Sequence, residues 1–588
     1  MELKLSTGGP AGSYAASVLS REGIEVAVLE AVKFPRYHVG NLIPSVRPYL
    51  RYIGAEEKMI DYGFTKKPGS AIKFNQFKRE GYTDFVALGA NNNAWNVIRS
   101  EFDQLLLQHA RDCGAQVYEE TKVSSITFDA DDPGKPTSIS WARSTPENGS
   151  KRGAVSGLTT FTHLIDASGS RAGVLSTKYL KNRHFNASLK NIAVWGYWSE
   201  GELVSNSTMG TEGGKSGMGT YGKGTTREGA PWFEALKDES GWAWFIPLHD
   251  GKTSVGIVMN QDRYNSQVAV GSKSSSLTQR YLANLHLAPG VVRLLNGKNV
   301  GSSAEESDES FQEGFENFCA TLEPGSVRSA SDFSYSAPDY AGNGYRIAGD
   351  AGAFIDPFFS SGIHLAFTSA LSAAATICAA RRNDCTEAQA AAWHTKRVAV
   401  SYTRQVEMNV RLLVLSAYKQ MRAQSVDALS DVDEDNFDRA FTLLRPVIQG
   451  ASDMGCRLSE SELQRSLDFC INLFNPTSPE EHESVGGLLT RLSEGNELMD
   501  VTKPVVDPET LKHALKASAP NCLSEIDGTK DSIAHEGCES KSKMVLDKIN
   551  ARRLVHSEYV INNLEAEELG GYVVRLDKGR LGLVKVTS

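Results

Sequence analysis

The hexapeptide TGGPAG (residues 7–12) decides how the first part of this 588-residue chain folds. Gly9 and Gly12 match the second and third glycines of the pattern G-x-G-x-x-G, and Thr7 stands where the first is expected. Glycines at such a turn let the backbone approach a pyrophosphate at the N-terminus of the following helix. A helical, alanine-rich segment does follow, over residues 10–22. The alternative is an ordinary strand-to-helix turn that favours glycine.

The segment after this helix supports the first interpretation. IEVAVLE (residues 24–30) is a compact apolar stretch that ends in Glu30, 21 residues after Gly9. An acid at about that distance is suited to bind a ribose hydroxyl of a dinucleotide. Strand, glycine turn, helix and strand together predict the start of a βαβ unit with a parallel sheet.

Two later strands and one arginine extend the pattern. THLIDASG places Asp166 and Gly169 at the end of a strand, and YRIAGDAG places Gly349 and Asp350 at the end of another. Arg99 precedes a second helical segment, SEFDQLLLQHARDCGA. In this order the pieces resemble the FAD-binding set of flavoprotein monooxygenases. The resemblance implies FAD as cofactor, with Asp350 binding a ribitol or ribose hydroxyl and Arg99 contacting the flavin. The expected cofactor-binding residues are Gly9, Gly12, Glu30, Arg99, Asp166, Gly169, Gly349 and Asp350.

The stretch GWAWFIPL narrows the resemblance to one chemistry. Trp242, Trp244, Ile246 and Pro247 match the W-x-W-x-I-P motif of flavin-dependent halogenases. Alternating tryptophans on a strand place both rings on one face. A bulky apolar wall near the flavin would keep substrate and water from the peroxide and disfavour direct hydroxylation. The alternative is an aromatic stripe in a core.

A lysine supplies the second halogenase feature. In KKPGSAIKF, Lys73 stands at the position of the family's catalytic lysine. A lysine amine can hydrogen-bond hypochlorous acid or form a chloramine, and partial burial would lower its pKa towards neutrality. The alternative is a lysine-rich exposed face, because Lys66, Lys67 and Lys78 are close in the sequence.

The third feature is DPFFSSGIHLAF (residues 356–367). Backbone N–H groups at a helix N-terminus favour an anion, and in the halogenases the small-small-Gly turn holds halide beside the flavin. Ser361 and Gly362 match that turn. The sequence here and in FPRYHVG (residues 34–40) resembles the corresponding sequences in the halogenases of fungal polyketide pathways. The substrates of those enzymes are phenolic or other electron-rich aromatics. The resemblance covers most of residues 8–450.

The resemblance implies a reaction sequence. Reduced FAD and dioxygen form a flavin hydroperoxide, and chloride or bromide at Ser361 and Gly362 is oxidised by it to hypohalous acid. The acid travels through a passage walled partly by Trp242 and Trp244 to Lys73, which presents the halogen to the aromatic ring. A general base could increase the reactivity of a phenol, and His38 and His249 are candidates.

Partners follow from what the chain lacks and from the family. No second G-x-G-x-x-G is present for NADPH, so we expect a separate flavin reductase to supply reduced FAD. The aromatic small-molecule substrate is either free or held by a polyketide synthase carrier domain.

The pattern along the chain predicts an α/β fold with a discontinuous FAD-binding domain (residues 1–72, 96–185 and 320–385). Aromatic, β-branched and glycine residues over 192–258 predict an antiparallel substrate sheet, assigned to residues 73–95 and 186–319. Residues 386–588 are expected to be mostly helical, with an irregular stretch at 476–545 and a final hairpin in YVVRLDKGRLGLVKV. Ser100 is expected to be an N-cap, residues 129–157 a hairpin with a long loop, and residues 298–314 a surface loop.

Bulk composition excludes several classes. A net charge of −9 argues against nucleic acid as the main partner. The sequence shows no apolar run of about 18 residues, so no membrane-spanning helix is expected. A secretory signal is not expected either. The eight cysteines are scattered without a C-x-x-C pair, so no metal site is expected and a reduced cytoplasmic compartment fits best.

Three features depart from the halogenase pattern. Thr7 replaces a glycine, and residues 1–5 (MELKL) are short and charged where a parallel strand is normally apolar. The segment after Gly40, Asn41-Leu42-Ile43-Pro44, is one residue shorter than usual. The open alternatives are therefore an FAD-dependent aromatic hydroxylase and an inactive flavoprotein homologue.

Overall fold

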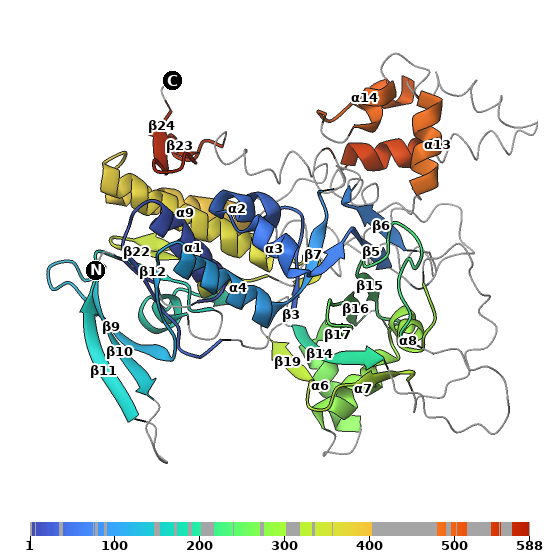
Figure 1. Ribbon diagram of the computed structural model, residues 1–588, viewed down its shortest axis with the longest axis horizontal. Helices are drawn as coiled ribbons and strands as arrows, with labels where there is room; N and C mark the ends of the chain where they lie inside the picture. Colours follow the sequence, from blue (N-terminus) through green and yellow to red (C-terminus); the bar gives the residue numbers. More distant parts are fainter. Residues whose placement is uncertain are drawn as a thin grey trace, which may run out of the picture.

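The structure is a computed structural model, and Figure 1 shows its elements along the chain. It describes all residues except 1–2, 6–7, 35–38, 74–75, 77–79, 87–90, 146–152, 170–172, 186–190, 201–216, 239, 271–275, 301–317, 332–334, 356, 403–478, 490–494, 501–502, 508, 514, 516–541, 552, 554–566 and 587–588. Thr7, His38 and Lys78 lie outside the described residues, as do 301–314 of the expected surface loop and most of the helical segment expected over 390–475.

A six-stranded sheet forms the first layer, in the order β21-β22-β12-β1-β2-β8. Its inner strands run parallel, and the short β1 is paired on both sides by β2 and β12. The bounds are β1 Leu3–Leu5, β2 Val26–Leu29, β8 Gln116–Tyr118, β12 His163–Asp166, β21 Ala341–Gly342 and β22 Tyr345–Ile347. The βαβ prediction and the parallel sheet are thus confirmed, even for the charged first strand.

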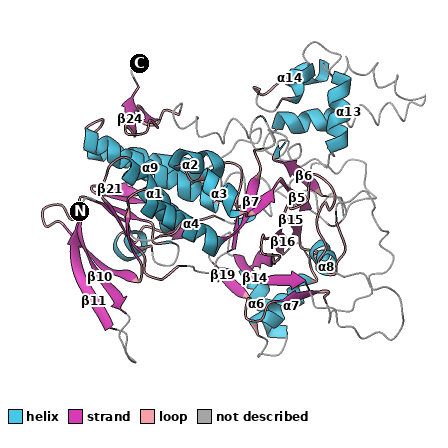
Figure 2. Cartoon of the chain, viewed as in Figure 1, coloured by secondary structure: helices cyan, strands magenta, loops and turns pink. Residues whose placement is uncertain are grey.

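Helices pack against this sheet and against each other. α1 (Pro10–Arg21) contacts both α4 (Arg99–Asp112) and the long α9 (Gly362–Arg382), and the three share one hydrophobic core. Small residues make this close packing possible, because α1 and α9 are rich in buried alanine and serine. α2 (Val46–Ile53) and α3 (Glu56–Tyr62) extend the layer (Figure 2).

An eight-stranded sheet forms the second unit, in the order β18-β14-β17-β16-β15-β5-β6, with β19 also paired to β14. We call it the substrate sheet, after the role expected of residues 73–95 and 186–319. Its strands are β5 Gly69–Lys73, β6 Gly81–Asp84, β14 Asn191–Glu200, β15 Trp232–Ala235, β16 Gly241–Pro247, β17 Thr253–Asn260, β18 Ala320–Leu322 and β19 Arg328–Ser331. Three helices accompany it, namely α6 Gln261–Val270, α7 Leu277–Leu285 and α8 Pro289–Leu295. The antiparallel sheet expected over 192–258 is confirmed.

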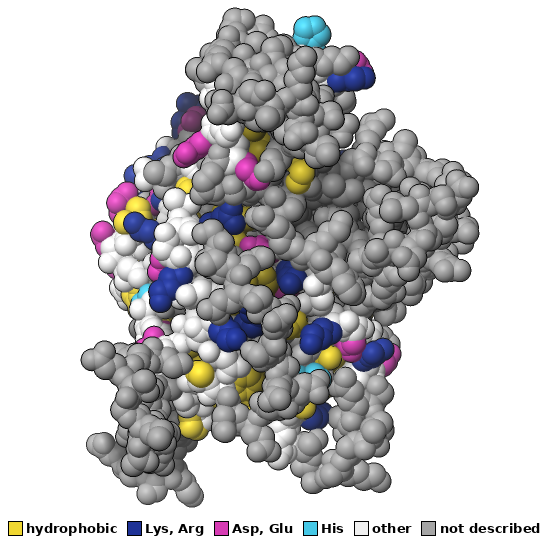
Figure 3. Space-filling model, turned by 90° about the vertical axis from the view of Figure 1, so that its right-hand side faces the viewer, with side chains coloured by type: hydrophobic (Ala, Val, Ile, Leu, Met, Phe, Trp, Pro, Cys, Tyr) yellow, Lys and Arg dark blue, Asp and Glu magenta, His cyan; other side chains and the backbone are white. Residues whose placement is uncertain are grey.

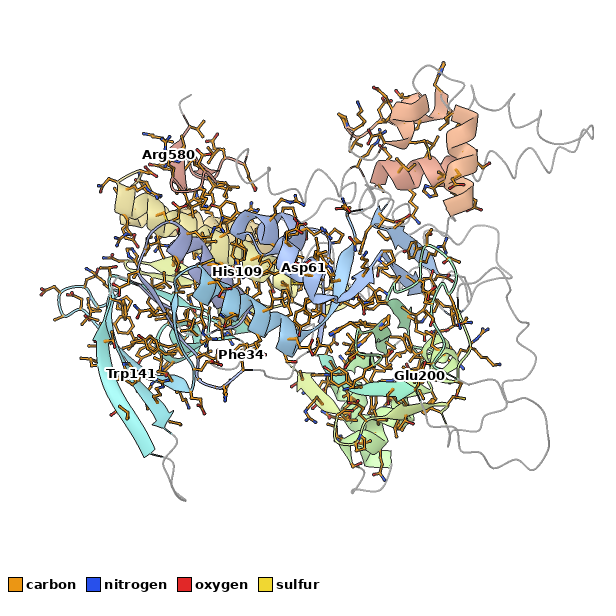
Figure 4. All side chains as sticks on the ribbon, in the orientation of Figure 1. Phe34, Asp61, His109, Trp141, Glu200 and Arg580 are labelled. Carbon is orange, nitrogen blue, oxygen red and sulfur yellow. The ribbon has the colours of Figure 1, made fainter. Side chains whose placement is uncertain are left out.

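Smaller sheets and turns complete the first two units. They are β3-β7-β4 (Val39–Asn41, Ala94–Ile98, Thr65–Lys67), β9-β10-β11 (Thr121–Phe128, Pro136–Thr145, Gly153–Thr160), the β13-β20 pair (His184–Phe185, Tyr335–Ser336), the π-helix η2 (Val174–Tyr179), and the 3₁₀ turns η3 (Gly349–Ala351) and η4 (Pro357–Phe359). In Figure 4, Trp141 marks the β9-β10-β11 sheet, which lies far from β14, marked by Glu200.

The C-terminal part divides between two places. Helices α13 (Pro479–Leu489), α14 (Gly495–Met499) and 542–551 form a small cluster with its own hydrophobic core. The buried Lys548 of this cluster donates to the Tyr82 carbonyl of β6. The hairpin β23 (Tyr572–Arg575) and β24 (Gly582–Lys585) instead packs on α9.

The structure corrects some of these expectations and refines others. Ser100 is not the N-cap, because β7 passes directly into α4 at Ile98 and Ser100 lies in the first turn. The hairpin expected over residues 129–157 is confirmed, because β10 and β11 pair antiparallel, and the two strands occupy about half of this range. The stretch 476–545 is not irregular throughout, because α13 and α14 lie in it. Finally, α9 is long and apolar enough to cross a membrane, but 83% of its most apolar window is buried inside the protein, as in a core helix.

Candidate functional site

The glycine turn leads into α1 as the motif predicts. Gly9 is the extended N-cap of α1, Pro10 is its first residue, and Gly12 is buried in the first turn. The Gly8 N–H donates to Glu30 Oε2 at 2.7 Å, so the acid at the end of β2 holds the turn before the helix. A Cβ on Gly8 would lie 2.8 Å from Leu107 of α4. The N-terminus of α1 thus presents the positive end of its dipole at this turn, an arrangement that suits an anion.

Gly349 and Asp350 follow β22 and approach this turn at the same, carboxyl end of the parallel sheet. Gly349 has a φ of +61°, and a Cβ there would lie 2.9 Å from the Ala11 Cβ, so glycine is required for α1 and this turn to approach. The Gly349 N–H donates to Ser369 Oγ of α9 at 2.9 Å. The structure therefore brings the first and last predicted cofactor segments together.

Arg99 lies beside the same region. Its guanidinium pairs with the fully buried Asp103 at 2.8 Å. Burial opposes the positive charge, but Asp103 first and then Asp350 and Tyr197 raise the pKa of Arg99. A Cβ on Gly40 would lie 2.3 Å from the Arg99 side chain, so β3 also passes close to it.

Asp166 has a structural role in the described contacts. Its Oδ1 accepts the N–H of Ser168 at 3.0 Å and its Oδ2 accepts the N–H of Leu175 at 2.6 Å. Gly169, with a φ of +79°, lets the chain turn within this loop. The pair thus shapes the loop that follows β12 at the carboxyl end of the parallel sheet.

The strand W-x-W-x-I-P lies with other aromatic residues on one face of the substrate sheet. Register partners across the sheet share a face, and the strand pairing groups Trp195, Phe233, Trp242, Trp244 and Ile72. We call this the tryptophan face. The rings of Trp242 and Trp244 lie 5.6 Å apart, and Trp244 Nε1 donates to Ser254 Oγ at 3.1 Å. Ile246 is buried, and the Pro247 carbonyl accepts from Asn96 Nδ2 at 3.0 Å.

The loop before α9 contacts the tryptophan face. The Phe358 ring lies 5.0 Å from that of Trp242 and 6.1 Å from that of Phe233. Ser360 has a φ of +57°, which is rare for a residue other than glycine. Two motifs more than a hundred residues apart in the sequence are therefore in contact.

Ser361 has no described hydrogen-bond partner for its hydroxyl although only 1% of the residue is exposed. It is the N-cap of the 21-residue α9, which begins at Gly362. A buried hydroxyl without a partner costs free energy unless a ligand accepts from it. Because the helix dipole favours negative charge here, the residues fit a small anion.

Lys73 does not lie on the tryptophan face. It is the last residue of β5 and pairs in register with Glu234 of β15, so it shares the opposite face of the sheet with Ala71 and Trp232. Ile72, the residue before it, faces the tryptophans. A passage between the tryptophans and Lys73, as the resemblance implies, would have to lead round the end of β5 to the opposite face of the sheet.

Glu234 is a buried acid that the sequence analysis did not single out. It is 1% exposed, and its carboxylate accepts the N–H groups of Val291 at 2.6 Å and Gly290 at 3.1 Å in α8. Burial raises the pKa of Glu234, while these two N–H groups and the charge of Lys73 oppose the rise. The signal that could have found it is one acid inside the apolar strand WFEA.

Lys67 corrects the alternative reading of the lysines as one exposed face. Lys66 is exposed, but Lys67 is 2% exposed, as alternation along β4 requires. Its Nζ donates to the Leu42 carbonyl at 3.0 Å and lies 5.4 Å from the Phe85 ring centre. Burial lowers the pKa of Lys67 to about 7.

The two histidine candidates receive little support as bases. His38 lies outside the described residues. His249 Nε2 lies 3.1 Å from Glu101 Oε2, and its ring packs edge-on against Phe64 at 5.3 Å.

In the part of the chain that is described, no three His, Cys, Asp or Glu side chains gather as a metal site would need. Figure 3 shows basic side chains mixed with acidic and apolar ones on the face it presents.

Comparison with family models gives two matches. A model described as "FAD binding domain" matches residues 7–137, and one described as "Tryptophan halogenase" matches residues 220–411. The first covers the glycine turn, Glu30 and Arg99, and the second covers the tryptophan motif and the loop before α9.

Two similar proteins match this chain in sequence over most of its length. The chain is 46% identical to the flavin-dependent halogenase armH1 of Armillaria mellea over 98% of this chain and 97% of the relative. It is 42% identical to the sulochrin halogenase gedL of Aspergillus terreus over 81% and 80%, respectively. Among solved structures, the flavin-dependent halogenase CmlS matches with a TM-score of 0.57, at 23% identity over 90% of this chain and 78% of that one. That structural likeness supports the fold.

Proposed function

This chain belongs to the flavin-dependent halogenase family, and we propose that it chlorinates an electron-rich, phenolic aromatic of polyketide origin, with Lys73 as the catalytic residue. Family membership establishes an FAD-dependent enzyme. The halide, the substrate and the residue roles are our proposal. The observation that carries it is Ser361, a buried hydroxyl without a described partner at the N-terminus of α9, in the loop that contacts the tryptophan face.

We place the cofactor site at the start of α1, where segments from early and late in the sequence of the first layer meet. We assign the pyrophosphate to the N-terminus of α1 at Gly9 and Gly12, and the adenosine ribose to Glu30. Asp350 and Arg99 hold the part nearer the flavin ring. Asp166 and Gly169 shape the loop after β12, which we place beside the cofactor as the resemblance implies. When bound, reduced FAD supplies with dioxygen the two-electron oxidation of halide to hypohalous acid.

The chain's own residues then control where that acid is made and used. Ser361 donates its hydroxyl hydrogen to the halide, and the backbone at Gly362 adds the positive end of the helix dipole. Phe358, Trp242 and Trp244 form an apolar wall that keeps water from the halide. Ile246 and Pro247 complete the strand that holds this wall in place.

Lys73 acts at the substrate. Its ammonium donates a hydrogen bond to the oxygen of hypohalous acid and gives up a proton as the aromatic carbon attacks the halogen. The oxygen leaves as water, the carbon–halogen bond forms, and the ring then loses its proton to restore aromaticity. Glu234 is the register partner of Lys73 on the neighbouring strand, and its interaction with Lys73 helps to position the amine.

The substrate class, the partners and the compartment are also part of the proposal. The resemblance in the loop DPFFSSG and the identity to a sulochrin halogenase support a polyketide-derived aromatic. A separate flavin reductase is the source of reduced FAD, and a synthase carrier domain is a further partner if the substrate is not free. Four cysteines in the described residues are unpaired, which supports a reduced, cytoplasmic setting.

The test is product analysis by mass spectrometry. The purified chain is incubated with a panel of phenols, FAD, NADH, a flavin reductase and chloride or bromide. We expect a product heavier by one halogen, with the isotope pattern of the halide supplied. A hydroxylated product that does not depend on halide would identify an aromatic hydroxylase instead. Protein that binds no FAD would identify an inactive homologue.

A further inference from the structure

Asn41 carries two buried polar atoms that no described group satisfies. It is the last residue of β3 and is 8% exposed. Neither its Nδ2 nor its Oδ1 has a hydrogen-bond partner in the part of the chain that the structure describes. A carboxamide both donates and accepts, and leaving both functions buried without partners is costly. The site therefore lacks a ligand that offers one acceptor and one donor side by side.

Its neighbour across the strand pair shows which way this site faces. Asn41 pairs in register with Asn96 of β7, so the two side chains share one face. Asn96 is fully buried, and its Nδ2 donates to the carbonyls of Pro247 at 3.0 Å and Gly229 at 3.1 Å. Its Oδ1 also lacks a described partner. The two asparagines thus face the end of the W-x-W-x-I-P strand.

The same place adjoins the other parts of the cofactor site. Gly40, the residue before Asn41, lies against Arg99. Leu42, the residue after it, is held by Lys67. Ser45 Oγ lies 3.0 Å from His364 Nδ1 in the first turn of α9, which ties this segment to the helix that begins after Ser361. Asn41 therefore lies between the Arg99 side of the FAD site, the tryptophan strand and the start of α9.

We propose that the Asn41 carboxamide binds the pyrimidine edge of the flavin ring, accepting from N3–H and donating to an adjacent ring carbonyl. This edge is the part of FAD that presents acceptor, donor and acceptor in a row, which matches a carboxamide. The proposal rests on the proposed function only in requiring FAD, and it gives the segment shortened by one residue a role in orienting the ring.

The decisive experiment pairs a change in the residue with a change in the cofactor. Asn41→Leu has nearly the same shape but makes no hydrogen bond, and 3-methyl-FAD lacks the N3–H donor. Dissociation constants are measured by flavin fluorescence for both proteins with both cofactors. We expect about a tenfold weaker binding of FAD by Asn41→Leu, as loss of one or two hydrogen bonds predicts. Methylation should weaken binding to the native chain far more than binding to Asn41→Leu.

The apoprotein supplies a second readout of opposite sign. Removing a polar group without a partner should raise the melting temperature of the FAD-free Asn41→Leu variant while its FAD affinity falls. Asn284→Leu is the matched control, because Asn284 is also buried but its Nδ2 donates to the Arg280 carbonyl at 2.8 Å. That control should lower the melting temperature and leave FAD affinity unchanged.

Several outcomes overturn the proposal. An equal methylation penalty in the native chain and Asn41→Leu would show that Asn41 does not contact N3. Unchanged FAD affinity together with a raised KM for the phenol would assign Asn41 to the substrate instead. Because these measurements need only FAD binding, they stand whether or not the chain halogenates phenols.

Discussion

Lys73 and Glu234 are register partners on the adjacent parallel strands β5 and β15, on the face of the substrate sheet opposite the tryptophans. Glu234 is buried and bound by two N–H groups of α8, whereas Lys73 is half-buried at the end of its strand. The buried carboxyl group and the more accessible amine are therefore an acid and a base held next to each other at the end of β5. The tryptophans that contact the loop before α9 and the proposed catalytic amine thus lie on opposite faces of the same sheet.

Replacing Lys73 should separate halogenation from flavin chemistry. Lys73→Ala removes the amine that donates to hypohalous acid, so we expect product formation to fall by about 100-fold or more. FAD binding and flavin oxidation should persist. Lys66→Ala, which changes an exposed lysine on β4, is the control and should retain activity. Persistent halogenation in Lys73→Ala would exclude the assigned role.

Replacing Glu234 should weaken the packing of α8 on the sheet. Glu234→Ala leaves the N–H groups of Gly290 and Val291 without their acceptor, and we expect a loss of about 2–3 kcal/mol in the free energy of unfolding. Glu234→Gln keeps an accepting oxygen and should lose less. Urea denaturation measures both, with Glu228→Ala as an exposed control that removes one acceptor for Gly224. Equal stability of Glu234→Ala and the native chain would contradict this role.

Replacing Ser361 should affect halide binding specifically. Ser361→Ala removes the donor that we assign to the halide, so KM for chloride should rise about tenfold with FAD affinity unchanged. Steady-state kinetics over a chloride series measures this effect. Thr386→Ala is the matched control, since the Thr386 hydroxyl already accepts the Gln389 N–H of its own helix. An unchanged chloride KM would remove Ser361 from the halide site.

Two buried histidines should make the protein sensitive to mild acid. Burial, and then the charge of Arg346, lower the pKa of His394 to about 3, and burial with Arg397 lowers that of His364 to about 4. Both must be neutral in the folded state, so their stabilisation is complete above about pH 6.5 and is lost as the pH falls towards 4 and 3. Each contributes a slope of about 1.4 kcal/mol per pH unit in that window.

The test compares urea denaturation of His394→Asn and the native chain between pH 7 and pH 4.5. We expect the variant to be less stable at pH 7, because it disturbs the bonds to Ser372 Oγ at 2.8 Å and to the Ile347 carbonyl at 3.0 Å. Its stability should fall less steeply with acid. His184→Asn, on an exposed strand, should keep the native slope. Parallel curves for His394→Asn and the native chain would refute the assignment.

The sequence allowed the parallel sheet, the substrate sheet and the terminal hairpin to be predicted, because strand patterns and glycine turns are local signals. Even the charged Leu3–Leu5 strand pairs on both sides, since β1 is fixed by its neighbours rather than by its own hydrophobicity. Glu234 and Lys67 were missed because burial of a charged residue depends on a distant partner, α8 in one case and Leu42 in the other. Ser100 misled because a cap residue is preferred only when no strand runs directly into the helix.

The hairpin of β23 and β24 has a consequence for the order in which this molecule can be completed. Its apolar residues join the core around α1 and α9, and the N–H groups of Gly579 and Leu581 donate to Glu22 at the end of α1. During synthesis this hairpin is made more than 500 residues after α1. Until the hairpin has been made, α1 lacks this part of its packing, and the apolar surface that the hairpin later buries is accessible to chaperones and proteases.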